Sequence, residues 1–464
     1  MNLFRRKSVT ELQAEAVADH RLRRALSGLN LTLLGIGAII GTGIFVLTGI
    51  VAALHSGPAV VLSFVIAGLV STFAALCYAE FASVVPVAGS AYSYVYATLG
   101  EFLAWIIGWT LVLEYALGAA AVAFAWSQHV LSVLPTLGIT VPAVGNLSPA
   151  LLIALTTALL VIGVKQAATI NALLVLVKVA IVLLFIISAA HAIDVANWHP
   201  FIPPQTVVDG TPVPGSFGWS GVLAGTVIVF FSYIGFDAVS TAAQEARNPQ
   251  RDIPIGIIGS LSICTVLYVL VAAIATGVVR YPALNVPDPF GLVASRAGLG
   301  SIALLIQLGG IIALTSIVLV LLFGQSRVFY AMARDGLLPA ILGSVHPRFR
   351  TPHVATVVAG TAVAIVATLV PLREIVNLVS LGTLLAFASV TIGVLVLRVR
   401  EPQLARPFKT PAVWFVAPAG LVSCVYLLNL LSVGTWVRFA IWLAMGLVIY
   451  FGYGVRKSRL VGRL

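Results

Sequence analysis

A cluster of glycines interrupts the first long apolar stretch of the chain, residues 30–54. The cluster reads Gly35-Ile36-Gly37-Ala38-Ile39-Ile40-Gly41-Thr42-Gly43. Its last three residues are poor helix formers, each roughly 0.5–1 kcal/mol less favourable than alanine. A helix that unwinds at Gly41, Thr42 and Gly43 exposes N–H groups that bind a carboxylate, assisted by the helix dipole. The alternative is close helix packing, because Gly37 and Gly41 also form a GxxxG pair.

A second interrupted apolar stretch, residues 220–244, lies five apolar stretches further along the chain. It carries Ser232, Gly235 and Asp237 near its middle. Successive spans alternate in direction, so two spans that are five apart run in opposite directions and are equivalent in two inverted repeats. Glycine-interrupted spans at equivalent positions of two repeats indicate a substrate site near the membrane midplane.

Three charged residues lie well inside apolar stretches, away from the ends of the predicted spans, namely Glu114, Lys178 and Asp237. Charged groups inside a membrane are costly, so each of them is a candidate functional group. Asp237 has an alternative role as a helix cap or as a group facing a water-filled cavity, and Glu114 as a hydrogen-bond partner of a neighbouring helix. Lys178 has no acidic residue four positions away, so it must bind carbonyl groups, an acid on another helix or water, or lose its proton.

Composition determines which elements must hold these residues. Of the 464 residues, 60% are apolar and 9% are charged, whereas soluble domains carry about 25% charged residues. The apolar stretches have the length of helices that cross a bilayer, and they are too long and too continuously apolar for barrel strands. We therefore predict an all-α integral membrane protein with twelve transmembrane helices. The predicted spans are approximately 30–54, 58–84, 99–133, 148–164, 168–191, 220–244, 255–279, 301–333, 354–370, 374–397, 412–431 and 436–455.

The basic residues predict the orientation of these spans. If the N-terminus is cytoplasmic, all but five of the 26 Lys and Arg residues lie in predicted inner segments. The five exceptions are Lys178, Arg280, Arg296, Arg373 and Arg438. This asymmetry follows the positive-inside rule and predicts that both termini are cytoplasmic. The net charge of +11 is therefore a topology signal, and we expect no nucleic-acid partner.

Residue types that build metal sites, disulfides or catalytic centres are scattered. Cys77, Cys264 and Cys424 lie in three different apolar stretches, and the seven histidines occur singly in or near predicted loops. We therefore expect no metal, no disulfide framework, no cofactor and no enzymatic activity. We also expect no cleavable signal peptide. Ser8-Val9-Thr10-Glu11 is a capping-box pattern, which predicts a short amphipathic helix within residues 1–28.

Several stretches of the chain resemble the amino acid–polyamine–organocation (APC) superfamily, most closely a bacterial twelve-span form of its cationic amino acid transporter branch. The matching stretches occur in the same order as in that family and extend over nearly the whole chain. They are the glycine cluster, Arg21–Leu26, Pro86–Tyr92, Gly235–Asp237, Glu245–Gln250, Ile253–Pro254, Arg327–Gly336 and Arg406–Phe408.

The resemblance implies a LeuT-like core of five plus five helices in inverted repeats, with spans 1 and 6 broken. It divides the chain into a cytoplasmic N-terminal amphipathic segment, a transport core and a C-terminal part containing spans 11 and 12. These parts are residues 1–28, residues 29–400 (with repeats of about 29–191 and 220–398) and residues 401–464.

The resemblance also implies an L-amino acid between the broken spans. Thr42 and Gly43, with Gly41 in the same break, then bind the carboxylate. The α-ammonium binds the carbonyl groups of Ile39, Phe231 and Ile234. The Phe231 ring covers the substrate, and Ser232, Glu114 and Leu321 complete the predicted substrate-binding set. Lys178 lies where related proton-coupled carriers have a lysine, and Asp237 joins it as a predicted proton-coupling residue.

These expectations combine into a predicted function. The chain is expected to be a secondary active transporter of L-amino acids in the plasma membrane that works by alternating access. Proton symport of small neutral or cationic amino acids is the first interpretation, and the bulky apolar Leu321 favours small substrates. An amino acid exchanger and a receptor without transport activity are the alternatives. A channel is disfavoured because three isolated charges do not form a continuous polar lining, and no protein partner is indicated.

Overall fold

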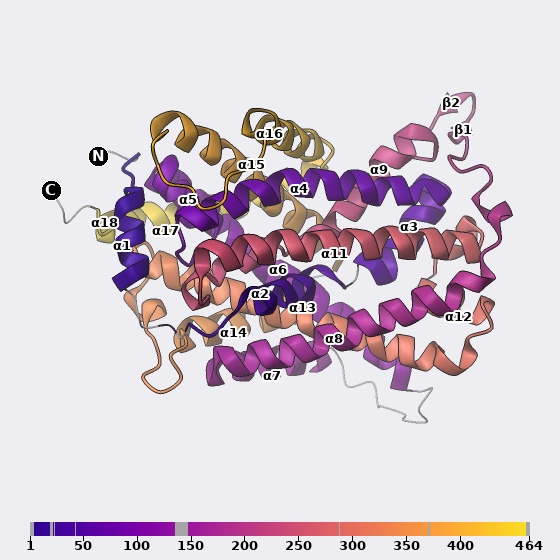
Figure 1. The fold of residues 1–464 in the computed structure, drawn as a ribbon, viewed down its shortest axis with the longest axis horizontal. Coiled ribbons are helices and arrows are strands. Elements are labelled where there is room, and N and C mark those ends of the chain that lie inside the picture. The colour runs from indigo at the N-terminus through magenta and orange to yellow at the C-terminus, as the bar shows by residue number, and fades with distance from the viewer. Residues whose placement is uncertain are drawn as a thin grey trace.

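The computed structural model describes residues 4–18, 22, 24–41, 43–134, 147–286, 288–369 and 372–460. In these residues the chain is almost entirely helical, and most of the long helices run along the long axis of the molecule (Figure 1). The first and last helices, α1 and α18, lie at the same end of the molecule, which we call the terminal end, and α1 crosses the ends of the long helices there (Figure 1).

The helices of four or more residues are α1 (Val9–Ala18), α2 (Gly28–Ile39), η1 (Gly43–Leu47), α3 (Thr48–Val51), η2 (Ala52–Ser56), α4 (Val60–Val84), α5 (Ala91–Thr98), α6 (Glu101–Val133), α7 (Leu147–Ile162), α8 (Val164–Ala189), η6 (Val195–Trp198), α9 (Gly218–Phe230), α10 (Ala238–Thr241), α11 (Pro249–Val278), η9 (Tyr281–Leu284), α12 (Pro289–Arg296), α13 (Gly300–Arg334), η10 (Ala340–Gly343), α14 (His353–Leu369), α15 (Leu372–Arg400), α16 (Val413–Asn429), α17 (Val433–Ile449) and η11 (Tyr450–Gly454). Three-residue turns of helix are η3 (Gly57–Ala59), η5 (Ala190–Ala192), η7 (Phe231–Tyr233), η8 (Ala243–Glu245) and α18 (Val455–Lys457). Strands β1 (Val207–Val208) and β2 (Thr211–Pro212) form a small antiparallel pair.

Within the described residues, eight helical segments are long and apolar enough to cross a membrane. They are Gly43–Val84, Glu101–Leu131, Val164–Ala192, Gly218–Thr241, Pro249–Val278, Leu304–Arg334, Asn377–Arg400 and Val433–Lys457. Shorter apolar helices are Gly28–Ile39, Pro149–Ile162, His353–Leu369 and Val413–Asn429. The expectation of an all-helical protein with many apolar spans is confirmed.

The first predicted helix break is present. α2 starts from a capping box formed by Ser27 and Asn30 and ends at Ile39, after which Ile40 has extended backbone angles (φ −73°, ψ 112°). Helical structure resumes as a π-helical turn at Gly43. Thr42 lies outside the described residues, so the break is defined by the residues on either side of it.

The second predicted break is also present. α9 ends at Phe230, the 3₁₀ turn η7 follows, and Ile234 is extended (φ −63°, ψ 138°). Gly235 then has a φ of +117°, a region that residues with a Cβ rarely adopt. A Cβ at this position would also lie 2.7 Å from the Cβ of Ala38. Glycine is thus required both for the backbone turn and for the close approach of α2.

Three pairs of helices that are five apart in the predicted span order pack against one another. α4 contacts α11, α6 contacts α13, and α7 contacts α14. Contacts between other helices also occur in pairs that are offset by five in this order. The contact of α2 with α11 corresponds to that of α9 with α4, and the contact of α13 with α8 corresponds to that of α6 with α15.

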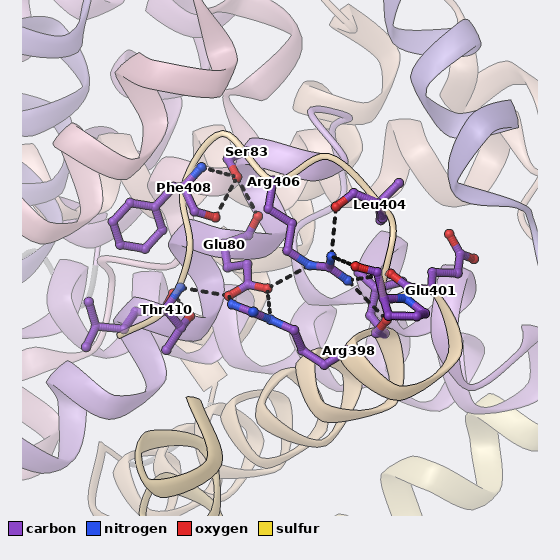
Figure 2. Close-up of polar contacts among 11 residues, drawn as sticks. Glu80, Ser83, Arg398, Glu401, Leu404, Arg406, Phe408 and Thr410 are labelled. Carbon is purple, nitrogen blue, oxygen red and sulfur yellow. Dashed lines mark hydrogen bonds and ion pairs between the residues drawn. The ribbon is translucent and has the colours of Figure 1, made fainter. Parts of the chain in front are cut away.

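A buried ionic network anchors the loop after α15 to α4 (Figure 2). The Glu80 carboxylate accepts two 2.8 Å hydrogen bonds from the guanidinium of Arg398 and one from the backbone N–H of Thr410, and Arg406 Nε lies 3.2 Å from it. Arg406 also donates to backbone carbonyls of its own loop, including Leu404. Every charge in this network faces an opposite charge or a backbone dipole, as buried ions require.

Candidate functional site

The two helix breaks meet at one internal cavity. Within the described residues, Ala38, Ile39, Gly43, Glu114, Gly118, Val122, Phe231, Ser232, Ile234, Ile317, Leu321 and Val379 line it. Seven of these belong to the predicted substrate-binding set, namely Ile39, Gly43, Glu114, Phe231, Ser232, Ile234 and Leu321. The fold therefore brings together residues that are separated by up to 282 positions along the chain.

The broken segments are in direct contact beside this cavity. A Cβ at Gly43 would lie 2.1 Å from Ser232 Oγ and 2.7 Å from Ser232 Cα, so that only glycine fits. The Tyr268 hydroxyl lies 2.7 Å from the carbonyl oxygen of Ile39 and 2.9 Å from that of Ser232. Tyr268 on α11 thus links the ends of the two breaks by hydrogen bonding to the backbone of both.

Lys178 of α8 binds the carbonyl end of α2. Its Nζ donates to the carbonyls of Gly37 and Ile40, each at 3.0 Å, and to Ser316 Oγ at 2.8 Å. The side chain is completely buried. Carbonyl groups at the end of a helix lack intrahelical partners and attract a cation. Of the partners that the sequence left open for Lys178, backbone carbonyls are the ones that the structure places around its Nζ.

Glu114 of α6 is buried beside the cavity, with 1% of its surface exposed. Neither of its carboxylate oxygens has a hydrogen-bond partner among the described residues. An unpaired buried carboxyl group is unfavourable by several kcal/mol unless it is protonated or meets a donor. The Thr383 hydroxyl lies close to this carboxyl group, and the cavity is the side from which a donor on a bound molecule can reach it.

Asp237 is buried close to this region but does not line the cavity. Its Oδ2 accepts a 2.5 Å hydrogen bond from the Tyr115 hydroxyl, while its Oδ1 has no partner in the part of the chain that the structure describes. Gly41 does not line the cavity either. Its carbonyl accepts from the N–H groups of Ile44 and Phe45, and a Cβ at Gly41 would collide with Ile317.

Sequence reasoning missed several residues of this site. Tyr268 and Ser316 were not predicted because a single hydroxyl in an apolar helix gives no signal until its partner is known. The apolar lining residues Val122, Ile317 and Val379 resemble side chains that face lipid. Gly118 was missed because one glycine in a long helix has no periodic signature.

Both ends of the region around the cavity are closed by contacts between distant elements. At the terminal end, the side chains of Arg327 and Glu245 form a 2.8 Å ion pair and are almost completely buried. The backbone of Leu26 forms an isolated β-bridge with that of Ala246. Burial raises the pKa of the Glu245 carboxyl, and the Arg327 guanidinium opposes this rise. At the other end, Phe290 of α12 packs against Phe45 and Phe185, with ring centroids 4.8 and 4.3 Å apart.

Comparison with known families gives a match over most of the chain. A model of the amino acid permease family matches residues 26–452. The chain belongs to the amino acid permease family. This permease is accordingly a multi-pass membrane transporter and not an enzyme.

Three characterised relatives illustrate the breadth of the family. The permease is 45% identical to a branched-chain amino acid permease and 43% identical to a methylthioribose transporter, both from Bacillus subtilis (strain 168), and each alignment covers 99% of both chains. It is 39% identical to the vacuolar cationic amino acid transporter 4 of Arabidopsis thaliana, over 87% of this chain and 68% of the relative. The resemblance to the cationic amino acid transporters is therefore confirmed.

Proposed function

We propose that this permease is a secondary active transporter of L-amino acids that works by alternating access. The observation that carries the proposal is the meeting of two broken helices at one cavity, lined by seven residues that the sequence predicted as substrate ligands. Unwound backbone inside a membrane is tolerated where it lines a cavity and binds a ligand.

The proposed binding mode uses mainly backbone groups. The N–H groups at Thr42 and Gly43, with Gly41 in the same break, receive the substrate carboxylate. The carbonyls of Ile39, Phe231 and Ile234 receive the α-ammonium. The Phe231 ring covers the bound substrate, and Ser232 completes this polar end.

The proposed substrates are small neutral or cationic amino acids. Leu321, Val122 and Val379 make the opposite side of the cavity apolar, whereas Glu114 supplies one acidic group. The printed names of the relatives include branched-chain amino acids, cationic amino acids and methylthioribose. The side-chain preference must therefore be measured for this permease itself.

We further propose that transport is coupled to protons through Lys178, with Asp237 as an accessory group. A charged Lys178 holds α2 by its contacts with the carbonyls of Gly37 and Ile40. Loss of its proton removes this attraction and lets α2 move, since a buried lysine is stable either when paired or when neutral. The alternative is that Lys178 only links two helices.

The topology proposed for the permease is twelve spans with five-plus-five inverted repeats. Matching contacts of helices five apart, such as α4 with α11 and α6 with α13, support a repeat. The basic residues support cytoplasmic termini, so that the terminal end faces the cytoplasm. The match to bacterial permeases supports a plasma membrane location.

A ligand-induced thermal-shift screen with the twenty L-amino acids tests the proposal, followed by uptake into proteoliposomes. A selective shift with uptake supports a transporter, and a shift without uptake favours a receptor. Uptake that requires amino acid inside the vesicle favours an exchanger. Failure of every amino acid to shift or accumulate contradicts the proposal.

Lys178→Met tests proton coupling. The charge that holds α2 is absent in this variant, so accumulation driven by an inward pH gradient should fall to the level without a gradient, while substrate-for-substrate exchange persists. Uptake by proteoliposomes with and without the gradient measures this. Equal gradient-driven accumulation by wild type and variant contradicts the role of Lys178, as does a strict sodium requirement in the wild type.

A further inference from the structure

An apolar groove opens on the outside of the helix bundle, where α7 and α14 pack against each other along one edge of the molecule (Figure 1). It has a volume of about 690 Å³. Alanine, glycine, threonine, valine and isoleucine side chains line it, from Ala150 to Ile162 on α7 and from Val357 to Ala364 on α14. Within the described residues, this groove shares no lining residue with the cavity between the helix breaks.

Small side chains make this surface concave. A Cβ at Gly360 would lie 2.1 Å from Thr157 Oγ1, so the two helices approach closely within the groove. Ala154 and Ala158, one turn apart on α7, are exposed and leave the groove open to its surroundings. The groove follows residues 150–162 of α7, a length of about 18 Å at 1.5 Å per residue. One leaflet is half of a hydrocarbon core about 30 Å thick, so the groove has the length and the lining that suit one extended acyl chain.

Three basic side chains lie near the end of this groove that is closest to the terminal end of the molecule. Lys165 follows the end of α7 by three positions. Thr351 Oγ1 donates a 2.8 Å hydrogen bond to the carbonyl of Val161, a lining residue. This bond holds the loop that contains Arg348 and Arg350 beside the same end of α7.

The charges of these three side chains are available to a ligand. Lys165, Arg348 and Arg350 are all exposed. None of them forms an ion pair with a residue that the structure describes. The apolar groove therefore ends at a group of uncompensated positive charges.

An anionic phospholipid complements both features, because its acyl chain fits an apolar groove and its phosphate is attracted to basic side chains. Basic pockets between transmembrane helices on the cytoplasmic side bind anionic headgroups. In the orientation proposed above, the basic end of the groove lies at the inner leaflet. We propose that the groove between α7 and α14 is a binding site for one anionic phospholipid of the inner leaflet, which binding does not depend on the proposed transport activity. The acyl chain lies along Ala154 and Ala158, and the phosphate lies among Lys165, Arg348 and Arg350.

Native mass spectrometry of the purified permease tests the proposal, with dioleoylphosphatidylglycerol as the probe and zwitterionic dioleoylphosphatidylcholine as the comparison. Wild type should retain one phosphatidylglycerol molecule and bind phosphatidylcholine more weakly. Combining Lys165→Gln, Arg348→Gln and Arg350→Gln should weaken phosphatidylglycerol binding at least about tenfold, because the attraction of three basic residues to the phosphate is lost. The matched control removes the same charge from exposed basic residues of other predicted inner segments and should bind like wild type. Its substitutions are Arg247→Gln, Arg251→Gln and Lys409→Gln.

Ala158→Phe tests the groove without changing a charge. The ring should occupy the groove and displace the acyl chain, which weakens phosphatidylglycerol binding at least about fivefold through lost apolar contact. Ala440→Phe is the matched control, because Ala440 is exposed on α17, away from the groove. Melting curves verify that each variant is folded, and Ala154→Phe replaces Ala158→Phe if the latter does not fold.

Each departure from these results overturns the site. Wild-type binding by the variant that lacks the three basic residues contradicts the headgroup contacts. An equal loss in its charge-matched control indicates a general attraction to positive charge. Wild-type binding by Ala158→Phe shows that the acyl chain does not occupy the groove. A dimer that Ala158→Phe dissociates would assign the groove to a second copy of the chain. All these outcomes leave the proposed function intact, because none of them depends on amino acid binding.

Discussion

Two glutamates of this permease are equally buried, each 1% exposed, but their surroundings differ. Glu80 accepts hydrogen bonds from Arg398 and Thr410 and lies beside Arg406, as Figure 2 shows. Glu114 has no hydrogen-bond partner among the described residues and borders the cavity between the helix breaks. Burial alone therefore does not identify a functional acid. The fold compensates the charge of Glu80, whereas it leaves the oxygens of Glu114 to a molecule in the cavity.

The largest expected effect in this comparison is on stability. Glu80→Gln leaves Arg398 and Arg406 without their counter-charge, and removing one partner of a buried ion pair costs about 3–5 kcal/mol. The apparent melting temperature in detergent should fall clearly. Glu401→Gln, which changes an exposed acid of the same loop, is the matched control and should melt like wild type. Equal melting of Glu80→Gln and wild type would contradict the structural role of Glu80.

The next effect is on binding and should appear without a loss of stability. Glu114→Gln removes no hydrogen bond seen within the described residues, so its melting temperature should equal or exceed that of wild type. A hydrogen bond to a charged group contributes about 1.5–3 kcal/mol, so the binding of amino acids with a cationic side chain should weaken about tenfold to a hundredfold. Isothermal titration calorimetry measures this affinity. If Glu114→Gln binds with wild-type affinity, or if its melting temperature falls as far as that of Glu80→Gln, the two glutamates do not have the different roles described here.

A smaller effect is expected for the side-chain preference. Leu321→Ser opens the apolar side of the cavity and adds a hydroxyl, so longer or polar amino acids should compete about fivefold better, while small ones lose packing and affinity. Gly118→Ala should make longer amino acids compete less well, because its Cβ would lie 3.2 Å from Leu321 Cδ1 and would narrow the cavity. Competition against a radiolabelled substrate measures both variants. If the competition by the amino acids is unchanged in both variants, Leu321 and Gly118 do not select the substrate.

The sequence predicted the elements that carry local signals. Consecutive poor helix formers at Gly41–Gly43 and the glycine at 235 indicated both breaks, and isolated charges identified Glu114 and Lys178 as buried polar residues. The capping-box prediction at Ser8 was also correct, since Ser8 Oγ accepts from the N–H of Glu11 at 3.1 Å. These features depend on intrinsic backbone preference or on the cost of burying charge, which can be evaluated from a single sequence.

The features that the sequence did not reveal depend on which helix faces which. Tyr268 links the two breaks only because α11 packs beside both of them. Ser316 meets Lys178 because α13 packs against α8. In a membrane protein, apolar side chains cover both the lipid face and the internal cavities, so that hydropathy does not separate them. Residue identity alone therefore did not predict Val122 or Val379 as lining residues.

The central claim is that an amino acid binds where the two breaks meet, and Gly43→Val tests it most directly. Any Cβ at Gly43 collides with Ser232 and would obstruct the backbone N–H groups that are proposed to receive the carboxylate. Gly452→Val is the matched control, because a Cβ there has nothing within 4 Å. Equilibrium dialysis with the amino acid that gives the largest thermal shift should show that Gly43→Val loses binding while Gly452→Val retains it, with melting curves verifying that both proteins are folded. Wild-type binding affinity in folded Gly43→Val would contradict the account.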